Sequence, residues 1–177
     1  MPSDRVKKLV YAALFAALTA VSAPLTIGLP YVPITLQTFF VMLSGAVLGP
    51  YFGALSMAVY LLLGFIGLPV FAGFHSGLGV LAGYTGGYLI GFLLCPIAIG
   101  LIVRMRKKPG LLWYGMAMAA GTLVIYAFGV AQLSIVTHMP LDKAALVGAL
   151  PFVPGDILKI IVASIVAWKL KLSEAVR

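Results

Sequence analysis

The most constraining feature of this sequence is a long stretch without charge, because no Lys, Arg, Asp or Glu lies between Lys8 and Arg104. Charged residues make up 9% of the 177 residues and apolar residues 63%, whereas a soluble domain averages about 25% charged residues. So little charge cannot cover the surface of a soluble domain, which indicates an integral membrane protein. The sequence also argues against an outer-membrane barrel, since no alternation of apolar and polar residues runs through it.

Apolar stretches separated by Gly, Pro or basic residues predict a single all-α membrane domain over residues 1–177. A helix needs about 20 residues to cross a membrane, so six helices would occupy about 120 residues and leave short connections. The first span is expected to bend near Pro24. The expected spans are residues 6–27, 35–48, 51–66, 84–103, 111–135 and 155–170.

Three basic clusters predict the orientation of this six-helix bundle. With six spans, the N-terminus, the loop after the fourth span and the C-terminus share one side of the membrane. Cytoplasmic segments are enriched in Lys and Arg, so both termini are expected in the cytoplasm, and the net charge of +8 indicates orientation rather than nucleic-acid binding. The first apolar stretch is too long for a cleavable signal peptide. The clusters are Arg5, Lys7 and Lys8; Arg104, Arg106, Lys107 and Lys108; and Lys169 and Lys171.

A carboxylate and an amine lie close together at the start of the last expected span. Asp156 and Lys159 are spaced i and i+3, which puts them on one side of a helix. Charges there are costly unless they are paired, reach the headgroups or bind a ligand, and a helix N-terminus favours the carboxylate. The pair offers an acceptor beside a donor, as a cyclic urea or amide requires. The residues alone support a ligand site and a structural ion pair equally.

The connection over residues 64–87 is long, rich in glycine and expected on the outer side. Glycine lets the backbone approach a ligand closely, and Phe71 and Phe74 supply apolar walls. We therefore expect a lid or a re-entrant loop, with a merely flexible loop as the alternative. His75 has no second His or carboxylate nearby in the sequence, so no metal site is expected.

Further polar residues gather at the expected outer ends of the helices. Thr35 and Gln37 enter the second span, where they can bind a ligand or bridge neighbouring helices. Tyr84 and Thr85 lie at the outer start of the fourth span. These four residues are therefore candidates for the same outer site as Asp156.

Small residues on the first span indicate close helix packing. Alanines recur every four residues in two parallel rows, Ala12, Ala16 and Ala20 in one and Ala13 and Ala17 in the other. Packing inside the bundle and docking of a partner explain these rows about equally well.

The sequence has no motif that could supply energy for transport. No phosphate-binding loop, row of carboxylates or catalytic Ser or Cys set is found. An uptake protein of this kind would therefore need a separate motor.

Five motifs occur in order along nearly the whole chain. They are the alanine rows, VPITLQT at residues 32–38, GLPVFAG at 67–73, GYTGGY at 83–88 and PFVPGD at 151–156. Together they make the sequence resemble BioY, the biotin-binding S-component family of energy-coupling-factor (ECF) transporters. Tyr84 departs from the family pattern, in which a proline usually precedes the Thr-Gly-Gly.

The resemblance implies a protein of a prokaryotic cytoplasmic membrane, and no enzyme, that captures biotin from outside for ATP-driven import. It implies as partners a transmembrane coupling subunit, which would dock on the alanine rows, and two cytoplasmic ATPases, with no cofactor or nucleic acid. Asp156 and Lys159 match positions associated with the ureido ring. The other residues expected to bind substrate are Thr35, Gln37, Phe71, Phe74, His75, Tyr84, Thr85 and Gly86. The alternatives are an S-component for another water-soluble vitamin, a small membrane enzyme acting on lipid headgroups and a passive channel.

Overall fold

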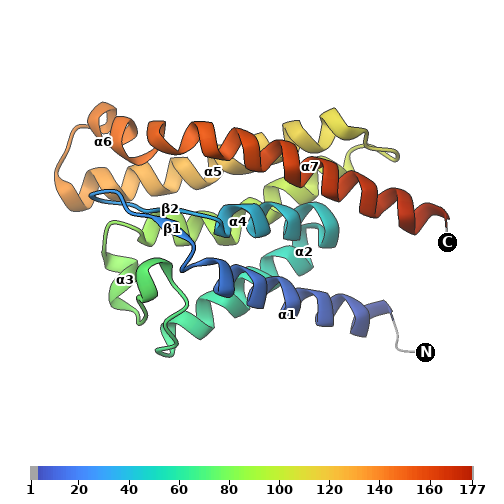
Figure 1. The fold of residues 1–177 in the computed structure, drawn as a ribbon, viewed down its shortest axis with the longest axis horizontal. Coiled ribbons are helices and arrows are strands. Elements are labelled where there is room, and N and C mark those ends of the chain that lie inside the picture. The colour runs from blue at the N-terminus through green and yellow to red at the C-terminus, as the bar shows by residue number, and fades with distance from the viewer. Residues whose placement is uncertain (1–3, 177) are drawn as a thin grey trace.

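The computed structural model describes residues 4–176, with side chains described for residues 4–170. It is mostly helical, as the sequence predicts, and its long helices lie side by side (Figure 1). The helices are α1 (Asp4–Ser22), α2 (Gln37–Phe65), α3 (Gly79–Ala82), α4 (Gly86–Arg104), α5 (Leu111–Thr137), α6 (Leu141–Gly148) and α7 (Val153–Val176), with the 3-10 turns η1 (Ala72–Phe74) and η2 (Leu150–Phe152).

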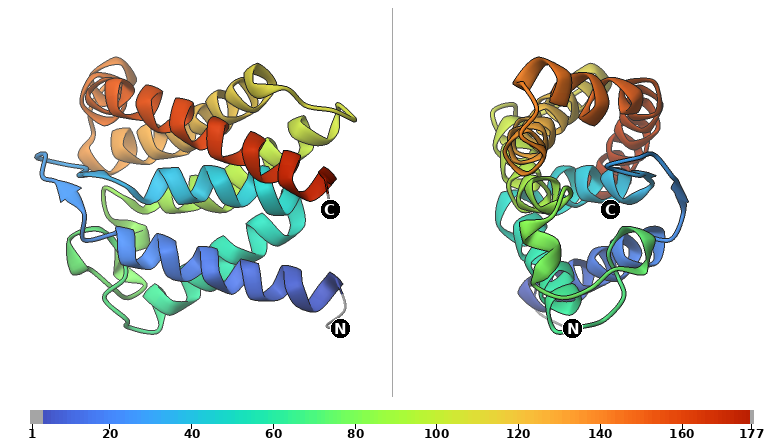
Figure 2. Two further views of the ribbon diagram at one scale, coloured as in Figure 1. Left: turned by 45° about the vertical axis from the view of Figure 1, so that its right-hand side comes forward. Right: turned by 90° about the vertical axis from the view of Figure 1, so that its left-hand side faces the viewer.

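The first helix is shorter than the sequence predicts. The prediction that it continues to residue 27 is wrong, because α1 ends at Ser22 and the chain then forms β1 (Thr26–Ile27), which pairs antiparallel with β2 (Ile34–Thr35). Pro24 lies at this change, and a proline cannot donate the backbone hydrogen bond that would continue a helix. The hairpin lies at the end of the bundle that also holds α3 and α6, and its second strand leads back into the bundle to the start of α2 (Figure 2).

Helix α2 contains a sharp break. Gly49 has φ +81° and ψ −178°, a conformation open essentially to glycine alone, and Pro50 follows it. The chain runs away from the hairpin, turns at this point and comes back toward the same end (Figure 1). The two halves of α2 correspond to the second and third spans expected from the sequence.

Four segments of the described chain are long and apolar enough to cross a membrane: α2, α4, α5 and residues 141–170. The sequence-based count of six spans treats the halves of α2 separately and includes α1, which begins with the charged residues Asp4, Arg5, Lys7 and Lys8. That count therefore stays a prediction.

The core forms where α4 lies between α2 and α5. Gly91 of α4 allows this close approach, since a Cβ there would lie 2.7 Å from the Cα of Ile125 on α5. Helix α1 packs against α2, and α7 packs against both α2 and α5. The first turns of α7 are thereby held next to the start of α2 and the middle of α5.

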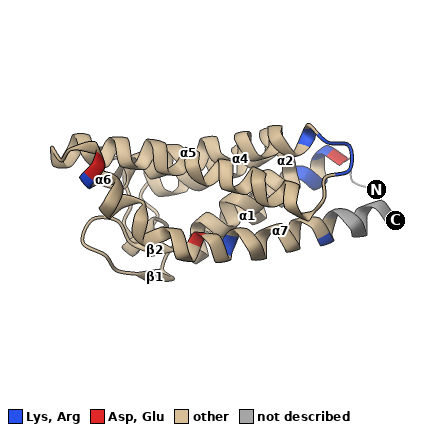
Figure 3. Cartoon of the chain, turned by 90° about the horizontal axis from the view of Figure 1, so that it is seen from above, with Lys and Arg blue, Asp and Glu red and all other residues tan. Residues whose placement is uncertain are grey.

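Most basic residues of the described chain gather at one end of the molecule, although Lys143 on α6 and Lys159 on α7 lie away from it. Figure 3 shows blue segments concentrated at the end of the bundle where α1 begins. Arg104 lies over the break at Gly49 there, and the guanidinium of Arg106 stacks on the Trp113 ring, 4.2 Å from its centroid. The side chain of Lys171, the last member of the predicted clusters, lies outside the described residues.

Candidate ligand-binding site

The first turns of α7 carry an ion pair that is largely removed from solvent. Lys159 Nζ lies 2.9 Å from Asp156 Oδ1, and the side chains are 13% and 5% exposed, respectively. The i, i+3 spacing makes this contact local to one helix. Asp156 also lies in the first turn, where unpaired backbone N–H groups favour a negative charge.

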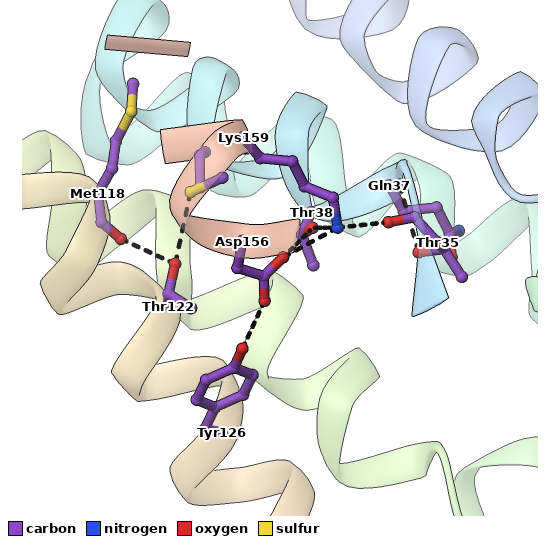
Figure 4. Close-up of polar contacts among 9 residues, drawn as sticks. Thr35, Gln37, Thr38, Met118, Thr122, Tyr126, Asp156 and Lys159 are labelled. Atoms are coloured by element: carbon purple, nitrogen blue, oxygen red, sulfur yellow. Dashed lines mark hydrogen bonds and ion pairs between the residues drawn. The ribbon is translucent and has the colours of Figure 1, made fainter. Parts of the chain in front are cut away.

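The ammonium of Lys159 reaches from α7 to the start of α2 (Figure 4). It donates to the carbonyl oxygen of Thr35 at 2.7 Å, to Thr38 Oγ1 at 2.9 Å and to Asp156 Oδ1 at 2.9 Å. A lysine ammonium has three donors, so these three partners use all of them. The charge is thus both neutralised and fully hydrogen-bonded.

The carboxylate of Asp156 is held from two further sides. Tyr126 on α5 donates its hydroxyl to Oδ2 at 2.5 Å, and the Thr38 hydroxyl donates to Oδ1 at 3.3 Å. With Lys159, that makes three hydrogen bonds to a group that can accept about four. The carboxylate keeps room for another donor.

A cavity of about 60 Å³ opens beside this ion pair. An ordered water needs roughly 10–15 Å³ of such volume, so the cavity is narrow and would hold a few waters. Its polar wall is formed by Asp156, Lys159, Tyr126, Thr35, Thr38, Gln37 and Thr85, and its apolar wall by Val32, Pro33, Phe71, Ala72, Tyr88, Leu89, Phe92, Ile125 and Phe152. One polar side within an otherwise apolar cavity is the usual form of a small-molecule site.

Gln37 joins the cavity to the connection that follows α2. Its side-chain amide donates to the Tyr60 hydroxyl at 2.5 Å, and that hydroxyl donates to the carbonyl oxygen of Val70 at 3.2 Å. Next along the chain, Phe71 is buried and makes edge-to-face contacts with the Tyr60 and Phe65 rings. These contacts anchor the first part of the connection against α2.

The structure brings together six of the ten residues expected to bind substrate: Asp156, Lys159, Thr35, Gln37, Phe71 and Thr85 all line the cavity. The expected Phe74, His75, Tyr84 and Gly86 do not line it.

Each of these four residues has another position. Phe74 is 65% exposed, and His75 is exposed as well. Tyr84 is 46% exposed and packs edge-to-face on Tyr31. Gly86 is buried under Gln132, whose amide donates to the carbonyl oxygens of Leu81 and Gly83. Gly86 therefore supports the turn into α4 rather than the cavity wall.

Thr38 and Tyr126 contribute hydroxyl groups to the site, although neither residue is among those expected from the sequence. Thr38 is part of the VPITLQT motif, in which nothing sets it apart from Thr35 and Gln37 as a ligand contact. Tyr126 lies in the middle of an apolar helix, where a hydroxyl is the only sequence signal that could have indicated a polar contact. The cavity-wall residues Phe92 and Phe152 carry no sequence signal that separates them from ordinary core residues.

The two alanine rows of α1 face different ways. Ala12 and Ala16 are buried inside the bundle, and Ala20 is half-buried. Ala13 and Ala17 are exposed. Packing within the molecule thus accounts for the first row, whereas the second row remains accessible to a partner.

Comparisons with known proteins agree with this architecture. The BioY family profile matches residues 1–175. The chain is 46% identical over 172 residues to "Biotin transporter BioY" of Thermotoga maritima, covering 97% of this chain and 100% of that protein. It is 42% identical over 167 residues to "Probable biotin transporter BioY" of Pyrococcus horikoshii, covering 94% and 98% of the two chains.

A solved structure has the same fold. The crystal structure of the S-component for biotin from an ECF-type ABC transporter superposes with a TM-score of 0.86 at 30% sequence identity, covering 97% of this chain and 94% of that chain. The match with the family profile extends over nearly the full length, and several relatives exceed 30% identity over most of their length. The chain therefore belongs to the BioY family.

Proposed function

We propose that this protein is the biotin-binding S-component of an ECF-type transporter. The observation that carries the proposal is the Asp156–Lys159 pair, buried at one side of an apolar cavity in a chain of the BioY family. The similarity to biotin transporters and to a solved S-component for biotin supports biotin as the ligand. The protein binds and delivers its ligand and is not an enzyme.

The chemistry of the cavity suits the ring system of biotin. A cyclic urea offers two N–H donors and one carbonyl acceptor. Asp156 can accept a further hydrogen bond from such an N–H, and the ammonium of Lys159 beside it is a donor suited to the carbonyl. Phe71, Phe92 and Phe152 supply apolar surface for the sulfur-containing ring and the aliphatic tail. Because the cavity is narrow, ligand entry requires movement of its wall, and the connection over residues 64–83 is the segment we expect to move.

In our proposal the protein lies in the prokaryotic cytoplasmic membrane, surrounded by lipid, with six spans and both termini in the cytoplasm. The basic end near α1 and α7 then faces inward, and the cavity opens toward the outer side. ATP-driven import requires a transmembrane coupling subunit and two cytoplasmic ATPases. Ala13 and Ala17 give the coupling subunit an exposed row of small residues on which a helix can lie closely.

Mass spectrometry of the small molecule that co-purifies with the protein tests the ligand directly. We expect biotin, and we expect purified, ligand-depleted protein to bind labelled biotin at one site per chain. A different vitamin in the purified protein, with no binding of labelled biotin, would contradict the proposal and leave an S-component of another specificity. Turnover of a lipid by the lone subunit would contradict it in favour of an enzyme.

A further inference from the structure

The Thr38 hydroxyl makes both of the hydrogen bonds that a cyclic urea would make with the ion pair. It accepts a hydrogen bond from Lys159 Nζ at 2.9 Å and donates one to Asp156 Oδ1 at 3.3 Å. Lys159 Nζ and Asp156 Oδ1 also bond each other at 2.9 Å. The three atoms thus form a closed triangle at the polar wall of the cavity (Figure 4).

A ligand carbonyl can reach Lys159 only if one of its present partners leaves, because all three ammonium donors are used. The Thr35 carbonyl belongs to the backbone of β2, which is held by pairing with β1. Asp156 carries the opposite charge and lies one turn away on the same helix. Thr38 is the neutral partner, and a rotation about χ1 can move its hydroxyl.

Thr38 has an alternative hydrogen bond for the time when it leaves the pair. Threonine in a helix populates two χ1 rotamers, so the Thr38 hydroxyl can rotate away from the pair. The carbonyl oxygen of Thr35, which lies in β2 just before the helix and shares Lys159 as a partner with Thr38, has two lone pairs and can accept a hydrogen bond from the displaced hydroxyl. Displacement of the hydroxyl therefore need not leave it unsatisfied.

We propose that Thr38 is an internal stand-in for the polar head of the ligand. In the ligand-free pocket its hydroxyl accepts the hydrogen bond of Lys159 and donates one to Asp156. When the ligand binds, its carbonyl and N–H replace the hydroxyl in these two bonds. This inference rests on the proposed function, and it assigns Thr38 to competition with the ligand rather than to binding it. The hydroxyl keeps the buried pair satisfied while the pocket is empty, since an unsatisfied buried polar group destabilises the folded state.

Replacing Thr38 by valine tests the inference, because valine has nearly the same shape, has no hydroxyl and leaves no space for a water. For Thr38→Val we expect titration calorimetry in detergent to give biotin binding at least about threefold tighter than in the unchanged protein. We also expect a lower melting temperature of the ligand-free protein and a larger stabilisation by biotin, as linkage requires. Thr38→Ser keeps the hydroxyl and should resemble the unchanged protein in both measurements.

Thr137→Val is the matched control. The Thr137 hydroxyl donates to the Leu133 carbonyl at 2.6 Å and does not line the cavity, so loss of this hydroxyl should not alter biotin affinity. Unchanged or weaker biotin binding by Thr38→Val would overturn the inference, because Thr38 would then be a bystander or a direct ligand contact. If Thr38→Val does not fold, a crystal structure of the biotin-bound protein decides: Thr38 Oγ1 still bonded to both Lys159 and Asp156 contradicts the stand-in role. A protein that binds no biotin at all would refute the proposed function instead.

Discussion

Replacement of Asp156 by asparagine tests the central interaction of the proposed site with little change in shape. The carboxylate accepts hydrogen bonds from Lys159 at 2.9 Å, from Thr38 at 3.3 Å and from Tyr126 at 2.5 Å. Asparagine replaces one oxygen by an NH₂ group, so in either orientation of the amide a donor faces Lys159 or Tyr126. The substitution therefore removes the charge and also places a donor against another donor.

The expected loss of affinity follows from the bond that the ligand makes. A hydrogen bond to a charged group contributes about 1.5–3 kcal/mol, and each 1.4 kcal/mol corresponds to about tenfold in Kd. A ureido N–H that loses the Asp156 carboxylate should therefore weaken biotin binding by about tenfold to a hundredfold. Breaking the pair also leaves the Lys159 ammonium without its counter-charge in a buried position, which destabilises the protein.

Titration calorimetry of the purified protein measures this change. Asp142→Asn is the matched control, because Asp142 lies in α6, is exposed and does not line the cavity; its Kd should equal that of the unchanged protein. A Kd for Asp156→Asn within about threefold of the unchanged protein would refute the reasoning, since the carboxylate would then make no bond to the ligand.

Three other predictions follow from the contacts described above. Tyr126→Phe removes the donor to Asp156 Oδ2 and should weaken biotin binding by about tenfold in the same titration. Tyr51→Phe, at an exposed position away from the cavity, is the control and should have no effect. Equal affinities in the two variants would exclude a role for the Tyr126 hydroxyl. Gly49→Ala places a Cβ on a residue with φ +81° and 2.8 Å from Arg104 Nη2, so thermal unfolding should show a loss of stability of about 1–3 kcal/mol. Gly28→Ala, with open space around it, is the control. A melting temperature unchanged by Gly49→Ala would mean that the turn tolerates a side chain. The double variant Ala13→Leu, Ala17→Leu should reduce co-purification with the coupling subunit and leave the Kd for biotin unchanged. Ala119→Leu, at an exposed position on α5, serves as the control. Undiminished co-purification of the double variant would place the docking surface elsewhere.

The sequence alone was enough to predict a helical membrane protein and to place Asp156 and Lys159 on one side of the same helix. The first prediction depends on the near absence of charge, which is a property of composition. The second depends on i, i+3 spacing, which is fixed by the geometry of one helix and needs no information about the rest of the fold. The break between residues 48 and 51 was also visible, because Gly-Pro interrupts a helix for local steric reasons.

Only the tertiary structure decided which other groups surround that pair. Thr38 and Tyr126 lie 118 and 30 residues from Asp156 in the chain, and their contact with it depends on how α2, α5 and α7 pack. The same packing buries Ala12 and Ala16 and exposes Ala13 and Ala17, although the two rows have the same spacing in the sequence. Periodicity identifies the residues that share a helix face, but the neighbouring helices determine whether that face is buried, lines a cavity or stays exposed.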